Sequence, residues 1–540
     1  MPVVDLAYQN LVKLVGDPAI RDVLPFLGLD IESDSEGVIR VEYSPNRPDY
    51  STEYGISLGL QGLMGTKTGL YNLDVADSEV YAIRAEDSVS QIRPRVASIA
   101  ARGAVDDYLI RQLIAMQEDL HTGLGRRRRV ASIGIHDLDS ISFPVRYAAV
   151  SRDHRFVPLD SEETMTVDEI LDTPLGEAYG HILDGHADVP MLLDADDRTI
   201  SFPPVINSAL TTVTERTKGL LIEVTGLDRI VEDVLMITAV TLQAAGLVLH
   251  QVDVSGAGNC SLKLDNRRLS IPTGTITDIL GLSIPHQDII SSLNRCRLDA
   301  SIRDGVVHCT VPPYRFDILG PMDLVEEVAL GYGIGNLSPV LSPSPTIGQK
   351  NDHIERLEAV GRSMIGLGYT EVMSSSLASR KVLYDMPRRS SQEMMPLASS
   401  KSQEHTMLRD SILPGLVSIL SRNIHEVYPQ RLFETGTTFL HSTQSFPVDE
   451  RVCLACVDAS HSASFSNTKS ILQAILHSVG AKCNTAPADH PTFEKGHGAD
   501  VICSGRVLGH IGELSRDVID DLKIRVPVAA FEIDLDGIIS

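Results

Sequence analysis

The chain has 540 residues, of which 43% are hydrophobic and 22% charged, and at roughly 150 residues per domain this length predicts three or four domains. These proportions exclude a mostly disordered chain, a collagen and a coiled coil. No apolar run reaches the 18 or so residues that span a bilayer, so no membrane partner is expected. A net charge of −25 excludes general attraction to nucleic acid, so contact with RNA requires a local basic patch or a partner subunit.

The first segment, residues 1–88, is expected to be an α+β module. It contains a predicted helix over residues 51–62, with Asp49 or Ser51 as its N-cap residue. The second, residues 89–262, is expected to be α+β as well. Its apolar runs predict strands over 131–135, 220–224 and 247–252, and a helix over 232–245.

The third segment, residues 263–338, predicts a compact module. Helices are expected over 271–282 and 286–294, followed by an alternating strand over 306–311 and a helix over 322–330 that Pro321 opens and Gly331 ends. Proline and serine mark a linker over 339–349. The last segment, 350–540, mixes strands with helices, including helices over 352–366 and 413–424.

Seven cysteines are scattered along the chain, an odd and sparse set that does not indicate a disulfide framework. Cys453 and Cys456 have C-x-x-C spacing, but no second pair lies near them in sequence. Their apolar surroundings favour a buried strand over a redox or zinc site. This usage predicts a reducing compartment, and therefore the cytoplasm.

One dense basic run follows Gly125. In so acidic a chain, an arginine cluster is either a solvated loop or a clamp for phosphates. The residues that would make such contacts are Arg126, Arg127, Arg128 and Arg129.

A group of carboxylates lies around the start of the helix that Pro321 opens. Asp323 precedes Glu326 and Glu327 by three and four residues, so the three share a helix face, and Asp317 enters from the preceding loop. Such carboxylates repel each other unless a cation joins them, and Mg²⁺ prefers oxygen ligands. The alternative is an acidic first turn that holds no ion.

These residues resemble a known family, the phenylalanyl-tRNA synthetase beta subunits of archaeal and eukaryotic type. The resemblance spans nearly the whole chain. It rests on motifs that begin at Asn46-Arg-Pro-Asp49, Leu124-Gly-Arg, Phe202-Pro-Pro-Val, Ile222-Glu-Val-Thr, Pro312-Pro-Tyr-Arg, Leu408-Arg-Asp, Leu432-Phe-Glu and Gly509-His-Ile-Gly.

The resemblance implies a multidomain α+β fold. In it, N-terminal and editing modules precede a small winged-helix-like metal-binding module and a C-terminal antiparallel sheet with helices, similar to a class II synthetase but catalytically inactive. Class II chemistry needs a late arginine, and Ile533 follows Glu532 where that arginine would stand. The resemblance further implies an α2β2 complex with a catalytic alpha subunit, ATP as a substrate of the complex, tRNA(Phe) as a partner, and a structural Mg²⁺.

The second segment would then be the module that hydrolyses tyrosine wrongly attached to tRNA. Glu223 is the candidate acceptor for the phenol hydroxyl, with Thr225 on the same strand face and Asn207 for the substrate backbone or ribose. His136 and Asp137 could orient water, although a structural role at a strand end is favoured. A regulatory or scaffold paralogue that has lost editing remains the alternative. The missing late arginine disfavours a self-sufficient ligase.

Overall fold

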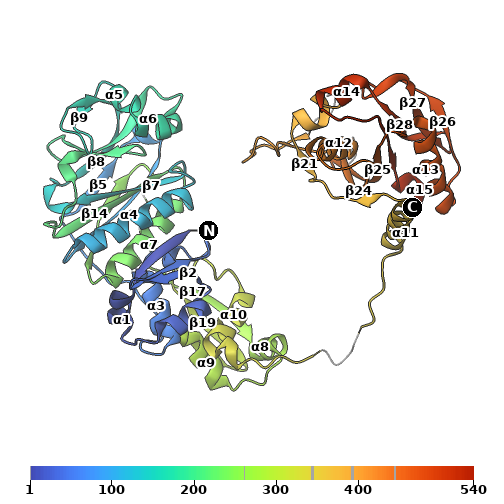
Figure 1. Cartoon of the computed structure of the whole chain (residues 1–540). Coiled ribbons are helices and arrows are strands. Elements are labelled where there is room, and N and C mark those ends of the chain that lie inside the picture. The colour runs from blue at the N-terminus through green and yellow to red at the C-terminus, as the bar shows by residue number, and fades with distance from the viewer. Residues whose placement is uncertain are drawn as a thin grey trace. The chain divides into compact units, whose positions relative to one another are not determined.

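The computed structural model describes residues 2–258, 260, 262–341, 346–390, 395–442 and 446–539. The chain divides into two compact units, Met1–Leu341 and Ser342–Ser540, shown in Figure 1. This division lies within the predicted linker, of which residues 342–345 are outside the described residues. No helix in the described ranges has the length and apolar character that a bilayer crossing requires.

The N-terminal module pairs a small antiparallel sheet with helices. The sheet has the order β1-β3-β2, and a core that includes Leu6, Leu11 and Ile39 joins it to the helices. Helix α3 is capped by Thr52, whose hydroxyl accepts a hydrogen bond from the Gly55 backbone N–H, and not by Asp49 or Ser51. The elements are β1 (Val3–Ala7), α1 (Tyr8–Val15), α2 (Ile20–Val23), β2 (Asp30–Ser35), β3 (Val38–Glu42) and α3 (Glu53–Leu63).

Two sheets form the next region. One has the order β4-β15-β6-β14-β7 and the other β13-β12-β11-β8-β5-β16. The strands of the first are β4 (Val75–Ala76), β6 (Arg95–Arg102), β7 (Ala131–Asp137), β14 (Gly219–Gly226) and β15 (Val248–Gln251). Those of the second are β5 (Ala82–Ala85), β8 (Val145–Ser151), β11 (Asp188–Leu193), β12 (Thr199–Phe202), β13 (Ile206–Asn207) and β16 (Asp253–Gly256).

Alternation along β14 decides what each of its faces meets. Ile222 and Val224 pack with helices α4 and α7, whereas Leu221 packs with Tyr147 and Leu192 of the second sheet. Residues with odd numbers on β14, including Glu223, therefore face the second sheet. The remaining elements here are α4 (Asp107–Thr122), β9 (Arg155–Phe156), β10 (Met165–Thr166), α5 (Val167–Leu171), α6 (Pro174–Tyr179) and α7 (Ile230–Ala244).

The third module has a sheet of order β17-β19-β18 with helices against it. Strand β19 has the bounds that the sequence predicts, and α10 begins at Pro321. The elements are β17 (Arg267–Pro272), α8 (Thr273–Leu280), α9 (His286–Arg295), β18 (Asp299–Arg303), β19 (Val306–Val311) and α10 (Pro321–Tyr332). The helix continues past Gly331, where the sequence analysis ended it, and stops at Tyr332 before Gly333, whose φ of 100° glycine adopts readily.

The second unit is built on a seven-stranded sheet of order β20-β24-β25-β29-β28-β27-β26. It contains β20 (Thr370–Glu371), β24 (Gln430–His441), β25 (Val448–Ala459), β26 (Cys483–Pro487), β27 (Phe493–Cys503), β28 (Arg506–Leu514) and β29 (Val528–Asp534). A small second sheet is made of β21 (Leu377–Ala378), β22 (Met395–Pro396) and β23 (Met407–Leu408). The helices are α11 (Asp352–Gly366), α12 (Leu413–Arg422), α13 (Phe465–Ser478), α14 (Arg516–Asp521) and α15 (Asp536–Ile539).

Cys453 and Cys456 are free and buried on β25, which confirms the strand interpretation. They are three positions apart on the strand, so they point to opposite faces of the sheet. Cys456 joins one hydrophobic core and Cys453 the other. The pair therefore cannot act together as a redox or zinc site.

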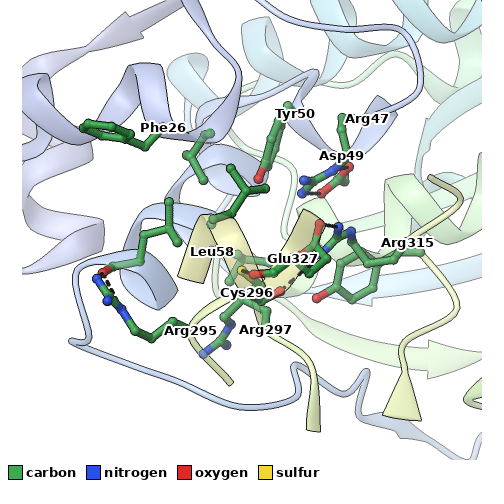
Figure 2. Close-up of a pocket in the computed structure, with 15 residues that line it drawn as sticks. Phe26, Arg47, Asp49, Tyr50, Leu58, Arg295, Cys296, Arg297, Arg315 and Glu327 are labelled. Atoms are coloured by element: carbon green, nitrogen blue, oxygen red, sulfur yellow. Dashed lines mark hydrogen bonds and ion pairs between the residues drawn. The ribbon is translucent and has the colours of Figure 1, made fainter. Parts of the chain in front are cut away.

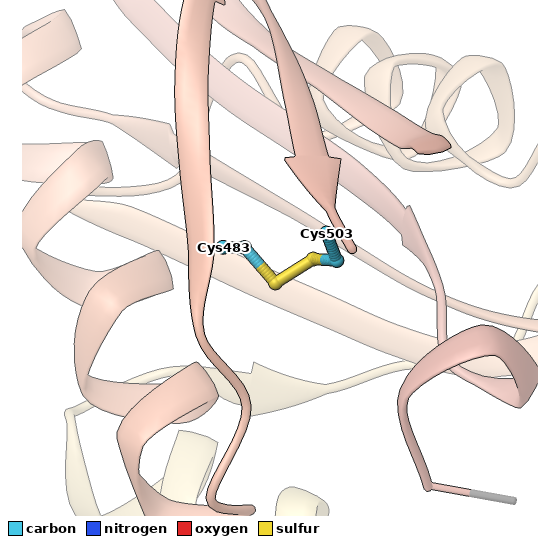
Figure 3. The surroundings of a disulfide bond; sticks show 2 residues. All are labelled: Cys483 and Cys503. Atoms are coloured by element: carbon cyan, nitrogen blue, oxygen red, sulfur yellow. A yellow bond between two sulfur atoms is a disulfide. The ribbon is translucent and has the colours of Figure 1, made fainter. Parts of the chain in front are cut away.

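A disulfide joins Cys483 to Cys503, as Figure 3 shows. The two residues lie directly opposite each other on strands β26 and β27. No local pattern predicts this bond, because the cysteines are 20 positions apart in sequence and only the strand register brings them together. The set is thus not a disulfide framework, but it contains one bond that the sequence analysis did not predict.

Candidate functional site

Glu223 is a buried carboxyl group without a hydrogen-bonding partner for one of its oxygens. Glu223 is 1% exposed to solvent, and its Oε2 atom has no hydrogen-bond partner. The other oxygen, Oε1, lies 3.8 Å from Nε2 of His136, an atom that is itself buried without a hydrogen bond. Because a buried polar atom without a partner costs free energy, this arrangement indicates a place where a ligand completes the bonding.

The space beside Glu223 exists because the residue opposite it is a glycine. Gly134 on β7 is the cross-strand neighbour of Glu223. A Cβ atom at position 134 would lie 2.4 Å from Oε1 of Glu223 and 2.5 Å from Nε2 of His136. Only glycine therefore leaves both side chains where they are.

Glu223 opens into a cavity of about 230 Å³. Its walls come from strand ends of both sheets and from α4, which covers the edge strand β7. Gln117 donates to the backbone carbonyl of Ile133, and Nε2 of His121 accepts from the Ile133 N–H. The lining includes Gln117, His121, Arg128, Ser132, Ile133, Leu175, Ser201, Phe202, Val205, Asn207 and Glu223.

The side chains of the arginine run, residues 126–129, lie in two different environments. Arg126, Arg127 and Arg129 are exposed in the turn between α4 and β7. Arg128 instead turns inward to line the cavity: it donates to the carbonyl of Val205 and to Glu118, and its guanidinium lies 4.2 Å from the ring centre of Tyr179. The structure thus separates Arg128 from the exposed residues with which the sequence had grouped it.

Thr225 shares the strand face of Glu223 but does not line the cavity. Its hydroxyl accepts a hydrogen bond from Nε of Arg93 at 3.0 Å, and its backbone carbonyl accepts another from the same guanidinium. Burial lowers the pKa of Arg93 to about 10. Thr225 therefore holds a buried cation, and the structure does not place it as a substrate contact.

Asn207 lies on β13 and lines the cavity. Its side-chain carbonyl accepts from Ser201, and its amide lies 3.5 Å from the carbonyl of Ile135. His136 is fixed from its other side by Thr211, with 2.9 Å between Nδ1 and the hydroxyl. Asp137 accepts from the Thr217 hydroxyl at the strand end, which is the structural role favoured for it.

The carboxylates of the third module do not converge. Arg315 is fully buried between Asp317 and Glu327 and forms paired hydrogen bonds with both. Burial by itself would raise the pKa of Asp317, but the Arg315 guanidinium overrides burial and lowers it. Figure 2 shows Arg315 and Glu327 of this group next to the Arg47–Asp49 pair of the N-terminal module.

The other two carboxylates lie elsewhere. Asp323 accepts hydrogen bonds from the backbone N–H groups of Leu319 and Gly320 at the start of α10, and Glu326 is exposed. In the part of the chain that is described, no group of three or more His, Cys, Asp or Glu side chains is arranged to hold a metal ion. The expected convergence of four carboxylates on one ion is therefore wrong for this structure, because an arginine already neutralises two of them.

A small cavity of about 30 Å³ lies at this junction of the N-terminal and third modules. That volume holds about one water molecule. Around it, Arg295 donates to the carbonyls of Leu63 and Gly331, and Arg297 donates to the carbonyl of Lys67. The junction is a packed contact between modules, too small for a substrate.

In the second unit, the carboxyl group of Glu532 receives hydrogen bonds from the protein itself. It accepts hydrogen bonds from the Ser411 hydroxyl and from the N–H groups of Ile412 and Leu413 at the start of α12. Ile533 next to it is fully buried in the core. No arginine side chain is thus presented at this point of β29.

Lining residues of the Glu223 cavity, and two residues that contact its strand β14, escaped the sequence analysis. Gln117 and His121 are four residues apart on α4, a spacing that places them on one helix face, but nothing in the sequence tells which strand that face covers. Arg93 lies far from Thr225 in sequence, and Gly134 has meaning only opposite Glu223. Burial lowers the pKa of His121, in keeping with its role as an acceptor.

Comparison with known proteins agrees with this architecture. Residues 338–535 match the model of the phenylalanyl tRNA synthetase beta chain CLM domain, and residues 269–334 match that of the tRNA synthetase B5 domain. An N-terminal fragment of the phenylalanyl-tRNA synthetase beta subunit from Pyrococcus horikoshii is 27% identical, with a TM-score of 0.58 over 62% of this chain and 100% of the fragment.

Full-length relatives extend the match to the whole chain. The phenylalanine–tRNA ligase beta subunit of Archaeoglobus fulgidus is 37% identical, covering 99% of this chain and 98% of the relative. That of Methanocaldococcus jannaschii is 33% identical, covering 99% and 100%. The modules are those of an aminoacyl-tRNA synthetase subunit, and the chain belongs to the phenylalanine–tRNA ligase beta subunit family.

Proposed function

We propose that this chain edits the product of a phenylalanine–tRNA ligase by hydrolysing tyrosine from tRNA(Phe), with Glu223 as the acceptor for the phenol hydroxyl. The observation that carries the proposal is the buried, unpartnered Oε2 of Glu223 in a cavity of about 230 Å³. Tyrosine supplies the missing hydrogen-bond donor, and phenylalanine leaves the oxygen unsatisfied. A site built to bind a hydroxyl rejects the analogue without it by roughly 10⁴–10⁵.

Synthesis belongs to the catalytic alpha subunit in this proposal, where ATP and phenylalanine react, and the complex is an α2β2 tetramer in the cytoplasm. The occupied Glu532 and the buried Ile533 support a C-terminal unit that resembles a class II catalytic module without its chemistry. Arg126, Arg127 and Arg129 are exposed beside the cavity entrance residue Arg128 and are proposed to contact tRNA phosphates.

The test is deacylation by the complex of this chain with an alpha subunit. Glu223→Gln keeps the size of the side chain but weakens the bond to the phenol. Loss of a charged hydrogen bond of about 1.5–3 kcal/mol should slow deacylation of tyrosyl-tRNA by roughly one to two decades. Phenylalanine attachment should be unchanged, and Glu215→Gln, on an exposed residue of the same region, is the control.

The outcome also separates the alternative function. If the wild-type complex does not deacylate tyrosyl-tRNA, the chain is a non-editing scaffold. If the wild-type complex does so and Glu223→Gln leaves the rate unchanged, Glu223 is not the acceptor. A parallel loss of synthesis and deacylation would show misfolding, and the conservative Glu223→Asp variant then decides, because it keeps the acceptor and should retain part of the deacylation activity.

Mg²⁺ binding forms a separate proposal. The four carboxylates as arranged do not fit one ion, but Asp323 and the exposed Glu326 are not held by Arg315. Mg²⁺ commonly binds through one or two carboxylates and keeps several waters. We expect the assembled complex to carry the ion at this pair, in a structural role. Metal analysis of Asp323→Asn with Glu326→Gln should then show its loss, and EDTA should lower the melting temperature of the wild-type complex only.

A further inference from the structure

The Cys483–Cys503 disulfide lies at the edge of the seven-stranded sheet, between strands β26 and β27 (Figure 3). Strand β26 is the last strand in the sheet order, and it pairs with β27 over five residue pairs from Cys483 to Pro487. Proline has no N–H to donate, and an edge strand has a hydrogen-bonded neighbour on one side only. The disulfide therefore joins a short and weakly held strand to the sheet at its first residue.

A cavity of about 260 Å³ lies between this sheet edge and helix α13. Alternation along the two strands places Cys483, Thr485 and Val501 on the face of the sheet that forms one wall. Among the described lining residues is Cys483 but not Cys503, which is 7% exposed. The cavity thus gives access to one sulfur of the bond and not to the other. The opposite wall is one face of α13, and its residues are Lys469, Leu472, Gln473 and Leu476.

The chemistry of this cavity suits a small-molecule thiol. A water molecule takes about 30 Å³ in the liquid, so the space holds a molecule of several heavy atoms. The leucine side chains face its hydrocarbon part, and the Lys469 ammonium favours negative charge, which an attacking thiolate carries. Where thiols are kept reduced, as in the cytoplasm proposed for this chain, a disulfide is usually transient and exchanges with such thiols.

We propose that Cys483 is a site of exchange with small anionic thiols, and that this exchange frees edge strand β26. A thiolate enters the cavity, attacks Sγ of Cys483 and forms a mixed disulfide with it. The bond to Cys503 breaks, its electron pair goes to Sγ of Cys503, and that sulfur takes a proton from water. A second thiolate attacks the sulfur of the bound thiol, so two thiols are oxidised to their disulfide while both cysteines are reduced.

Trapping the mixed disulfide tests which sulfur exchanges. Cys503→Ser leaves Cys483 at the cavity, and Cys483→Ser leaves the buried Cys503 as the matched comparison. The full chain of each variant is incubated with the disulfide of 3-mercaptopropionate, and the adduct is located by peptide mass spectrometry. Modification of Cys483 should be at least about tenfold faster than that of Cys503, because exchange requires access to the sulfur.

Trypsin measures whether the strand is freed, because exposed Lys482 stands directly before Cys483. In the wild-type chain purified in air, five of the seven cysteines should titrate as thiols. Added 3-mercaptopropionate should then raise cleavage after Lys482 at least about fivefold, since cleavage follows the population of the open strand. Cleavage after the exposed Lys401 should not change. The double variant Cys483→Ser with Cys503→Ser should be cleaved at the higher rate with or without thiol.

The charge preference is tested with two thiols of similar size and opposite charge, 3-mercaptopropionate and cysteamine, at equal thiolate concentration. Lys469→Gln should lower the ratio of their rates of reduction, anionic over cationic, by at least about threefold relative to wild type. Lys495→Gln removes a lysine that is exposed on β27 and does not line the cavity, and it should leave the ratio unchanged.

Three outcomes overturn the exchange site: a wild-type chain purified in air that lacks the Cys483–Cys503 bond, equal modification rates at the two cysteines, or cleavage after Lys482 that ignores the thiol. An unchanged rate ratio in Lys469→Gln overturns the anionic class of the thiol. The site belongs to the second unit, so none of these outcomes affects the editing proposal.

Discussion

Two buried glutamates of the first unit differ in the hydrogen bonds that their carboxyl groups receive. Glu223 is 1% exposed and Glu327 is 5% exposed. Glu327 receives two hydrogen bonds from Arg315, whereas one oxygen of Glu223 receives none and the other lies 3.8 Å from a histidine nitrogen. Both residues are buried, but the carboxyl group of Glu327 has hydrogen-bond donors for both oxygens, whereas Oε2 of Glu223 has none.

This difference in hydrogen bonding distinguishes a buried carboxyl group that stabilises the fold from one that can bind a ligand. A buried ion pair whose members satisfy each other needs no further partner, and here it ties the loop at Arg315 to helix α10. A buried carboxyl group left open costs free energy that only a ligand offsets. Glu53 shows a third solution: burial raises its pKa to about 7, and its carboxyl group accepts a hydrogen bond from Tyr108.

The largest expected effect is that of Arg315→Met. Removal of this guanidinium leaves Asp317 and Glu327 buried without their cation, which should lower the free energy of unfolding by about 3–5 kcal/mol. Urea denaturation of the purified chain measures it, with the exposed Arg303→Met as control, expected within about 0.5 kcal/mol of wild type.

The pH dependence of the Arg315 effect has a definite sign. The folded pKa of Asp317 is lowered, so its stabilisation is present above the unfolded pKa of about 4 and disappears as the pH falls through the folded pKa. The difference between wild type and Arg315→Met should therefore shrink in acid. A difference that grows in acid would contradict the assignment of the pair as an ion pair.

Glu53→Gln should have the next largest effect. With a folded pKa of about 7, Glu53 is protonated in the fold at a pH where the unfolded chain is ionised. Its favourable contribution is complete below about pH 4 and is lost as the pH rises to about 7, a change of about 3 kcal/mol at most. The variant should remove this slope in denaturation curves between pH 5 and 8. The exposed Glu79→Gln should retain it.

Gly134→Ala tests the open site by crowding it. The added Cβ would displace the end of the Glu223 side chain, and we expect roughly tenfold slower deacylation of tyrosyl-tRNA, equivalent to one weakened hydrogen bond. Phenylalanine attachment should remain. Gly274→Ala, where nothing lies within 4 Å of the new atom, should change neither activity.

The smallest expected effect is that of Glu223→Gln on stability. Because no protein hydrogen bond to Oε2 is lost, the free energy of unfolding should stay the same or rise by up to about 1 kcal/mol. Destabilisation as large as that of Arg315→Met would show that Glu223 is a structural group, and the comparison between the two glutamates would collapse.

Local patterns predicted most elements well. The helices over 322–330 and 352–366 and the strand over 306–311 lie within a residue or two of α10, α11 and β19, because proline, glycine and apolar periodicity act over short distances. Glu223 and Asn207 do line one cavity, and their role as substrate contacts stays a prediction. Thr225 does not line that cavity, because it binds Arg93, a partner that is distant in sequence and that no local pattern indicates.

The carboxylate cluster failed for a similar reason. Helical spacing correctly placed Asp323 and Glu326 near the start of α10, but it could not show that Arg315 binds Asp317 and Glu327. Arg315 stands two residues before Asp317 in the sequence. The direction in which its side chain points depends on how the loop packs, and no local pattern indicates it. A charge count along the chain therefore overstated the need for an outside cation.

The sequence by itself determined the bounds of several helices and strands, the buried C-x-x-C strand and the family resemblance, since these depend on composition, periodicity and motifs. Only the tertiary structure decided which buried charges have partners. The empty place beside Glu223, the Arg315 pairs and the Cys483–Cys503 bond all depend on register and packing between residues far apart in the chain. Long-range pairing of this kind has no local signal, because the interactions form only after the strands and helices have met.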